Sequence, residues 1–239
     1  MNTAIIMGVG PVDGLGGQLA KRFASLDLHV FIAGRTASSI DAVAADINAA
    51  GGKATAFKAD ATNETEVAEL YTKAAAAGPV KLAIYNAGNN TPGALGEMSA
   101  EYFEASWRIC CLGGFLFGRE AIKHMRGTGG ALLFTGASAS LRGRPNFGAF
   151  NSSKAALRVM AQAMAKEYGP EQVHVGHVVV DGAINGEKIK EGYPEFAEQL
   201  GEDGLIDLSA IVDAFEYLYQ QPKRGWSFEV DVRTAIENW

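Results

Sequence analysis

Cysteine is scarce in this sequence, and long apolar runs are missing. The two cysteines among 239 residues, Cys110 and Cys111, are adjacent. Adjacent cysteines fit neither a disulfide framework nor a zinc-ligand spacing, so we predict no metal site. No apolar run approaches the roughly 20 residues of a membrane-spanning helix, and the first residues carry no basic segment of a signal peptide. These absences predict a soluble, cytoplasmic protein without a membrane partner.

Positive charge is also limited. The 21 lysines and arginines face 27 aspartates and glutamates, which gives a formal net charge of −6. A general nucleic-acid binder needs a basic face, so we predict no nucleic-acid partner. Hydrophobic residues make up 48% of the chain, which is ample for the core of one domain of this length. We therefore expect residues 1–239 to form a single domain.

The chain does contain a regular alternation of short β-branched runs and longer Ala-rich segments. It predicts strands at residues 3–9, 28–33, 53–58, 80–86, 130–136, 173–180 and 227–233. It predicts helices at residues 15–25, 38–50, 64–77, 100–125, 150–168 and 209–219, where apolar residues recur three and four apart. Continuous apolar runs at 132–134 and 178–180 are typical of parallel strands buried on both faces. The fold class we predict is α/β, a doubly wound parallel sheet of about seven strands with helices on both faces.

In such a sheet, ligands bind beyond the carboxyl ends of the strands. The residues found there are Gly10, Gly34-Arg35, Asp60, Asn86-Ala87-Gly88, Ser138 and Asp181-Gly182. They are distant in the sequence, but the fold would bring them to one crevice.

The turn after the first strand has glycines at Gly10, Gly14 and Gly16 and leads directly into a helix. Glycines let a diphosphate approach the backbone, and the helix N-terminus offers free N–H groups. We interpret this turn as a dinucleotide site rather than only a tight turn. The second strand ends at Arg35 without an acid, which favours the 2′-phosphate of NADP(H) over the free hydroxyl of NAD(H).

The turn Gly10-x-x-x-Gly14-x-Gly16, then Asp60, Asn86-Ala87-Gly88, Ser138 and Lys154 together resemble the short-chain dehydrogenase/reductase family. The resemblance covers essentially the whole chain. It implies a Rossmann-type domain, hydride transfer involving a small-molecule substrate, and a homodimer or homotetramer built through the helices at 100–125 and 150–168. We also expect Trp226 and Trp239 near a subunit contact.

The resemblance implies a role for each matching residue. Ser138 would hold the substrate carbonyl, and Lys154 would bind the hydroxyls of the nicotinamide ribose. The residues implied to contact the coenzyme are Gly10, Gly14, Leu15, Gly16, Arg35, Asp60, Ala61, Asn86, Ala87, Gly88, Lys154 and Ile184.

Several positions depart from the family pattern. The catalytic tyrosine falls on Phe150, and an asparagine that anchors a proton-relay water falls on Cys110. The family's Pro-Gly after the sixth strand reads Asp181-Gly182, and a threonine falls on Gly186. The coenzyme half of the pattern is thus nearly intact. The proton-transfer half is degraded, and losing one general acid costs about 10²–10⁴ in rate.

Two functions remain open. The first is an NADP(H)-dependent oxidoreductase that acts on a small carbonyl, alcohol or activated double bond, with its proton from a water, Ser138 or Asp181. The second is a catalytically silent NADP(H)-binding sensor or structural subunit. Asp181 could be a replacement acid–base group, or it could cap the segment 183–190. Residues 183–205, which are irregular and rich in glycine and charge, are expected to form a substrate lid.

Overall fold

Seven strands form one parallel sheet in the computed structural model, which describes residues 1–237 apart from the side chain at position 188; Trp239 lies outside the described residues. The strand order is β3-β2-β1-β4-β5-β6-β9. The strands are β1 (Thr3–Met7), β2 (His29–Gly34), β3 (Lys53–Lys58), β4 (Val80–Tyr85), β5 (Gly130–Thr135), β6 (Val173–Asp181) and β9 (Glu229–Arg233). The order reverses between β1 and β4, and this switch point is where a crevice opens in such sheets.

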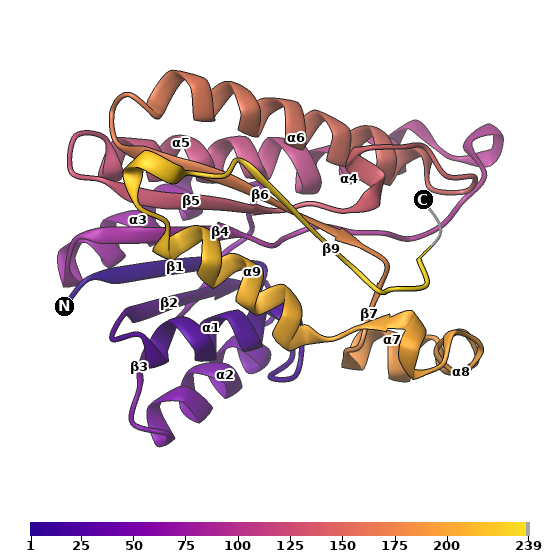
Figure 1. Ribbon diagram of the computed structural model, residues 1–239, viewed down its shortest axis with the longest axis horizontal. Coiled ribbons are helices and arrows are strands. Elements are labelled where there is room, and N and C mark those ends of the chain that lie inside the picture. The colour runs from indigo at the N-terminus through magenta and orange to yellow at the C-terminus, as the bar shows by residue number, and fades with distance from the viewer. Residues whose placement is uncertain (238–239) are drawn as a thin grey trace.

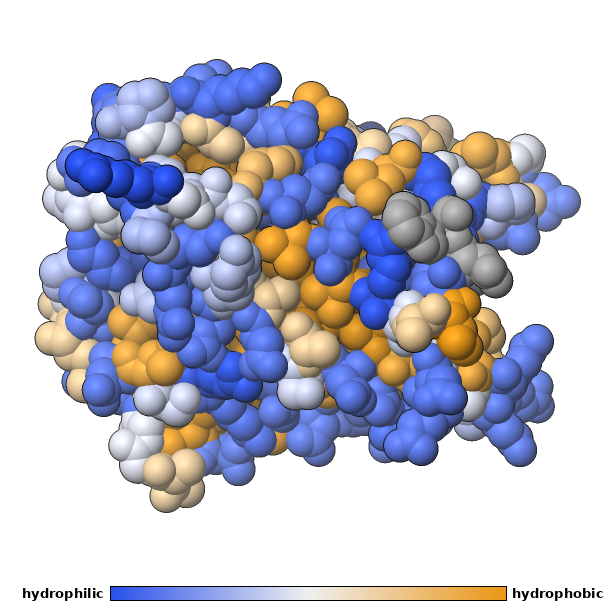
Figure 2. Space-filling model, in the orientation of Figure 1, coloured by the Kyte–Doolittle hydropathy of each residue, from blue (hydrophilic) through white to orange (hydrophobic). Residues whose placement is uncertain are grey.

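Helices cover both faces of the sheet (Figure 1). One face packs against α1 (Leu15–Ser25), α2 (Ala37–Ala49) and α9 (Leu208–Gln220), and the other against α3 (Glu64–Ala77), α5 (Gly113–Met125) and α6 (Gly148–Tyr168). Each face has its own apolar cluster, because β1 sends Ile6 to one and Ile5 to the other. The predicted doubly wound α/β fold is therefore confirmed. Figure 2 shows apolar side chains reaching the surface between α9 and β9.

The helix predicted at 100–125 is interrupted. It consists of α4 (Ala100–Trp107), a π-helical segment Arg108–Leu112 and then α5. The Tyr85 hydroxyl, at the end of β4, donates a hydrogen bond to the carbonyl oxygen of Ile109. This bond occupies a carbonyl that an α-helix would use internally, and the chain accommodates one extra residue per turn there. Such π segments are frequent at functional sites.

The segment 183–205 is more regular than its composition predicted. It contains α7 (Glu187–Gly192) and α8 (Pro194–Leu200), and β7 (Ala183–Ile184) pairs with β8 (Leu205–Ile206) in a second small sheet. Short 3₁₀ turns cover Leu95–Glu97, Ser138–Ser140, Glu202–Gly204 and Lys223–Gly225. Within residues 1–237, no helix combines the length and the apolar character needed to cross a bilayer.

Candidate functional site

The glycine-rich turn between β1 and α1 is built by close backbone contacts. Gly8 has a φ of +93°, and a Cβ there would lie 2.4 Å from the Ala87 nitrogen. A Cβ on Gly16 would lie 2.9 Å from the Gly8 oxygen. Gly10 is different, since nothing described lies within 4 Å of its Cβ position. Gly8 and Gly16 therefore permit chain packing, whereas Gly10 presents open backbone to a ligand.

Gly14 is the N-cap of α1 and offers no side chain to the first turn of that helix. The first turn carries no acidic residue, so its N–H groups and the positive end of the helix dipole face the turn. Leu15, the first helical residue, is buried and anchors the turn in the core. This arrangement suits an anionic diphosphate.

Asn86 holds three strand tips together. Its Nδ2 donates to the Gly8 oxygen over 3.0 Å, and its Oδ1 accepts from Thr135 Oγ1 over 3.0 Å. Its backbone N–H also bonds to the Met7 oxygen at 2.8 Å. Because β1, β4 and β5 end together at this side chain, Asn86 fixes the crevice edge where the glycine-rich turn begins.

At the other end of the crevice, Asp60 follows β3. Its Oδ1 accepts hydrogen bonds from the backbone and hydroxyl of Thr62, both at 2.8 Å. Burial disfavours the charged form of Asp60, but these two bonds and the charges of Arg35 and Arg108 outweigh burial and lower its pKa. Two guanidinium groups therefore act on the same carboxylate. Ala61, which follows it, is buried.

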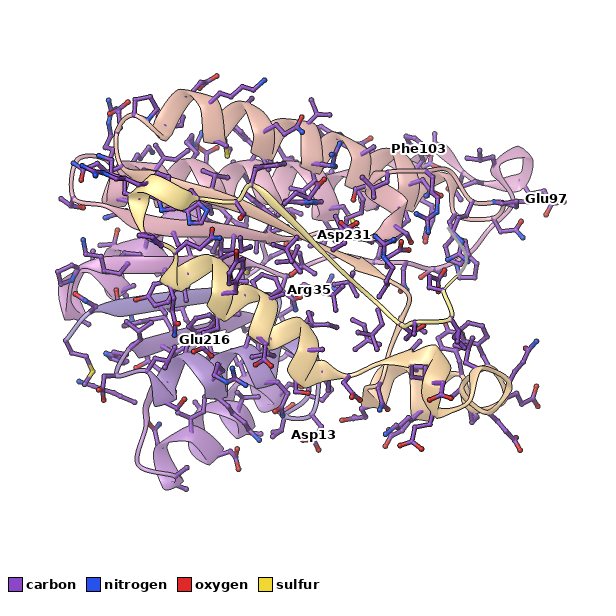
Figure 3. The ribbon with its side chains drawn as sticks, viewed as in Figure 1. Asp13, Arg35, Glu97, Phe103, Glu216 and Asp231 are labelled. Carbon is purple, nitrogen blue, oxygen red and sulfur yellow. The ribbon has the colours of Figure 1, made fainter. Side chains whose placement is uncertain are left out.

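Arg35 lies just beyond β2 and is exposed, and Figure 3 marks it together with Asp13 of the glycine-rich turn. Arg108, from the π segment, was missed from the sequence. No motif points to it, because its charge acts on Asp60 from the irregular turn of that helix. Arg35 and Arg108 both act electrostatically on Asp60 at this end of the crevice, and Arg108 Nη1 also lies 3.7 Å from Glu104 Oε1.

Lys154 lies on α6 and is 4% exposed. Its Nζ donates to the Thr135 oxygen at 2.7 Å, and burial lowers the pKa of this lysine, against the opposing influence of Cys110. No carboxylate in residues 1–237 forms an ion pair with it. The Nζ lies 5.8 Å from the centroid of the Phe150 ring. The two side chains share one face of α6, as their spacing predicted.

Cys110, in the π segment, is fully buried, as expected for a small apolar side chain. Its Sγ lies 3.6 Å from Asn89 Oδ1, which also accepts a 2.9 Å bond from the Ser106 hydroxyl. A Cβ on Gly88 would lie 3.5 Å from both Cys110 Sγ and Lys154 Nζ. Gly88 is itself exposed, so this point of the β4 tip opens directly over the lysine.

Ser138 lies three residues beyond the end of β5, which stops at Thr135, and it opens a 3₁₀ turn. It is 7% exposed, and its carbonyl accepts the N–H groups of Leu141 and Arg142. Throughout the described part of the chain, its hydroxyl has no hydrogen-bond partner. A hydroxyl without a protein partner, on a residue that is 7% exposed, is available to a ligand.

Asp181 is 1% exposed and is the last residue of β6. Arg142 Nη2 binds its Oδ1 at 2.8 Å, and Arg233 Nε lies 4.0 Å from its Oδ2. A carboxylate bound by a guanidinium acts as an acceptor, not as a proton donor. Capping by Asp181 is not observed, since the N-cap of α7 is Gly186.

Arg142 belongs to a loop that Asn151 holds in place. Asn151 Nδ2 donates to the Arg142 oxygen at 2.7 Å, and its Oδ1 accepts from the backbone nitrogen of Arg144 at 3.2 Å. The loop after Ser138 is thus fastened to α6 beside Phe150 and, through the Arg142–Asp181 pair, to the tip of β6. The sequence did not predict this connection, which spans 39 residues.

Beneath the crevice, His177 of β6 is fully buried and binds Glu229 Oε2 through Nδ1 at 2.9 Å. Arg158 binds both oxygens of the same carboxylate, at 2.6 and 2.7 Å. Burial lowers the pKa of His177 to about 4, and Glu229 opposes this only in part. His177 is therefore neutral at pH 7, and it is a packed residue of the sheet.

A cavity of about 340 Å³ lies between the glycine-rich turn and α7. It is lined by Asp13, Asn185, Gly186, Glu187, Lys190, Glu191 and Leu208. Ile184, in β7 just before this lining, is half-buried against the core. The cavity therefore lies between the β1 turn and the segment 183–205.

The fold and the glycine-rich turn define a nucleotide-binding α/β protein, and comparison with known proteins gives its family. The family model described as "short chain dehydrogenase" matches residues 2–191. The chain belongs to that family. The uncharacterized oxidoreductase YuxG of Bacillus subtilis is 32% identical over 185 residues, 75% of this chain. The chain spans only 27% of the length of YuxG.

Solved structures agree with this assignment. A short-chain dehydrogenase from Rhodopseudomonas palustris is 34% identical and superposes with a TM-score of 0.81 over 97% of this chain and 98% of its own. An alcohol dehydrogenase from Thermococcus sibiricus, complexed with 5-hydroxy-NADP, is 21% identical with a TM-score of 0.87, covering 100% and 99% of the two chains. The second similarity shows the shared fold.

Proposed function

We propose that this chain is an NADP(H)-dependent oxidoreductase that transfers a hydride to or from a small carbonyl, alcohol or activated double bond. The observation that carries the proposal is the buried Lys154, whose ammonium lies beside the exposed Gly88 at the open end of the crevice. A buried ammonium with no carboxylate beside it in residues 1–237 suits ribose hydroxyls and an electron-rich substrate.

The coenzyme would lie across the strand tips. Its diphosphate would bind the N-terminus of α1 at Gly10 and Gly14, and its adenine would lie near Asp60. Arg35 would bind the 2′-phosphate, and the alcohol dehydrogenase from Thermococcus sibiricus, which shares the fold, is complexed with 5-hydroxy-NADP. Bound NADPH would supply the hydride.

The chain's own groups would orient the substrate. The Ser138 hydroxyl would donate a hydrogen bond to the substrate oxygen, and Lys154 would hold the nicotinamide ribose. Phe150 has no proton to give, so the proton would come from water or Ser138. Asp181 is the weaker candidate because Arg142 already occupies one of its oxygens. The segment 183–205 would cover the substrate, and the subunits would pair through the α4–α5 and α6 helices.

Phe150 favours one second candidate, a silent NADP(H)-binding sensor or structural subunit. The test is to screen carbonyl and enone acceptors for NADPH oxidation with wild type and Asp181→Asn at matched thermal stability. We expect wild-type turnover, of which Asp181→Asn keeps at least about a tenth, because a positioning residue costs less than a general acid. A loss of about 10² or more would assign the proton to Asp181. NADPH binding without turnover of any acceptor would favour the silent binder.

A further inference from the structure

The ammonium group of Lys154 is surrounded by uncharged groups. Its Nζ donates to the Thr135 carbonyl oxygen at 2.7 Å and lies 5.8 Å from the centre of the Phe150 ring. A Cβ on Gly88 would lie 3.5 Å from this nitrogen and equally far from Cys110 Sγ. Among residues 1–237, Thr135 supplies the one hydrogen bond to Nζ, and no carboxylate pairs with it. Two of the three N–H bonds are therefore left, one for a ribose hydroxyl and one for a substrate oxygen.

Such surroundings hold a proton weakly. Burial withdraws the water that stabilises an ammonium ion, and here no negative charge takes the place of that water. Burial accordingly lowers the pKa of Lys154, and Cys110 opposes this only in part. Because an alcohol is a far weaker acid than an ammonium ion, an alkoxide that forms beside Nζ would take a proton from it.

The same nitrogen borders the space where the proposed substrate would lie. Gly88, whose Cβ position adjoins Nζ, is exposed. Thr135, which holds Nζ, is the last residue of β5, and Ser138 with its open hydroxyl follows three residues later. A serine donates a hydrogen bond more readily than it releases a proton. Ser138 would thus orient the substrate oxygen, and Lys154 would protonate it.

We propose that Lys154 is the general acid of the reaction and gives its proton directly to the substrate oxygen. This inference rests on the proposed function, and it makes water the source that reprotonates the lysine. The carbonyl carbon gains a C–H bond from the hydride of NADPH, and the carbonyl π electrons move to the oxygen. There an Nζ–H bond breaks and an O–H bond forms. Water entering beside Gly88 returns a proton to the amine, so that NADPH, one proton and the ketone give NADP⁺ and the alcohol.

The first test needs no coenzyme. In an NMR titration of the lysine Hε–Cε signals, Lys154 should lose its proton below the ordinary lysine pKa of 10.5. Its signal is assigned by its absence in Lys154→Arg or Lys154→Met. Lys166→Arg, which changes an exposed lysine of the same helix, should leave that signal in place. A Lys154 that titrates at or above the ordinary value would overturn the inference.

The second test follows the rate in both directions. Reduction of cyclohexanone by NADPH should slow as the pH rises, with an inflection below the ordinary lysine pKa, because the ammonium is lost. Oxidation of cyclohexanol by NADP⁺ should quicken over the same range, because the neutral amine must accept the alcohol proton. Lys154→Arg keeps a charge and N–H donors, but its guanidinium stays protonated. Both rates should therefore fall by about 10²–10⁴ and lose the inflection, whereas Lys166→Arg should behave as wild type.

Four other ionisable groups lie around Lys154 or along the same face of α6. His177, on which the charge of Lys154 acts, is neutral well above its pKa of about 4. Arg158 and Glu229 are paired with each other. The Cys110 thiol is the group that can titrate in the same alkaline range, so Cys110→Ala should keep both inflections.

A wild type without these inflections would overturn the inference, whether or not Lys154→Arg folds. So would their loss in Cys110→Ala, or a Lys154→Arg variant as fast as wild type. A wild type that binds NADPH and reduces no ketone would also overturn it. Failure to bind NADPH, read by fluorescence titration before any acceptor is added, would instead remove the proposed function itself.

Discussion

Single residues at this crevice form contacts that the sequence did not predict, or predicted differently. Asp181 stands where the resemblance places a proline, and its carboxylate is fastened by Arg142 from the loop after Ser138. Where a proline ring would restrict the chain, this chain has an ion pair between that loop and the tip of β6. The other oxygen of Asp181 lacks a hydrogen bond within residues 1–237. The pair fixes the Ser138 loop relative to β6.

His177 gives the chain a pH-dependent stability. Its pKa in the folded state is about 4, and the ordinary value is 6.5. The unfolded chain therefore binds more protons between pH 6.5 and 4, and the free energy of unfolding falls as the pH is lowered through that window. His177 alone would account for about 3 kcal/mol of this loss. Urea unfolding of wild type and His177→Gln from pH 7 to 4 measures it.

In His177→Gln, the free energy of unfolding should fall less steeply with decreasing pH than in wild type, but it should still fall. Burial also lowers the pKa values of His29 and His174, which add to the loss in the same direction. His124→Gln is the control, because His124 stacks on Tyr71 and lies outside the His177–Glu229 network. Equal slopes in wild type and His177→Gln would contradict the assignment of the pH dependence to this residue.

Among the elements, the π segment Arg108–Leu112 matters most to the site. It places Cys110 beside Lys154 and Arg108 near Asp60, and it is followed directly by Gly113. A Cβ on Gly113 would lie 2.3 Å from the Tyr85 hydroxyl and 3.0 Å from the Ala61 oxygen. The glycine therefore lets α5 approach the tips of β3 and β4 closely.

Gly113→Ala should lower the free energy of unfolding by about 1–3 kcal/mol, the usual cost of overpacking. Because the nearest atom is the Tyr85 hydroxyl, the double variant with Tyr85→Phe should recover part of that loss, and a double-mutant cycle in urea measures the coupling. Gly96→Ala, where nothing described lies within 4 Å, should change the unfolding free energy by less than about 0.5 kcal/mol. If the effects of Gly113→Ala and Tyr85→Phe on the unfolding free energy simply add in the double variant, the close approach of position 113 to the Tyr85 hydroxyl would be contradicted.

The regular elements were largely predictable because local patterns set them. The helices at 15–25 and 64–77 and the strand at 53–58 match the structure residue for residue. The π segment was not predictable, since its cause is a hydroxyl about 24 residues away in the chain. The two short helices of the segment 183–205 were missed because glycines and charges hid their weak apolar periodicity. Short elements depend on packing more than on propensity.

The candidate site likewise has a part that was predictable from the sequence and a part that was not. Glycines and strand-end residues such as Asn86 and Asp60 were predicted because the fold alone brings strand tips together. The contacts of Asp181 with Arg142, of Asn151 with the loop after Ser138 and of Arg108 with Asp60 depend on side-chain directions, which no spacing rule supplies. The sequence predicted a site at the strand tips, which stays a prediction, and the structure supplied the contacts of the residues there.

At the scale of the whole molecule, the proposed function requires a phosphorylated nicotinamide coenzyme to lie across the strand tips. The most direct test is calorimetric titration of wild type, Arg35→Ala and the surface control Arg224→Ala with NADPH and NADH. We expect wild type and the control to bind NADPH more tightly than NADH. Arg35→Ala should weaken NADPH binding about 10- to 100-fold, as loss of a charge-assisted bond implies, and leave NADH binding little changed. Absence of binding heat for both coenzymes, or tighter binding of NADH, would contradict the account.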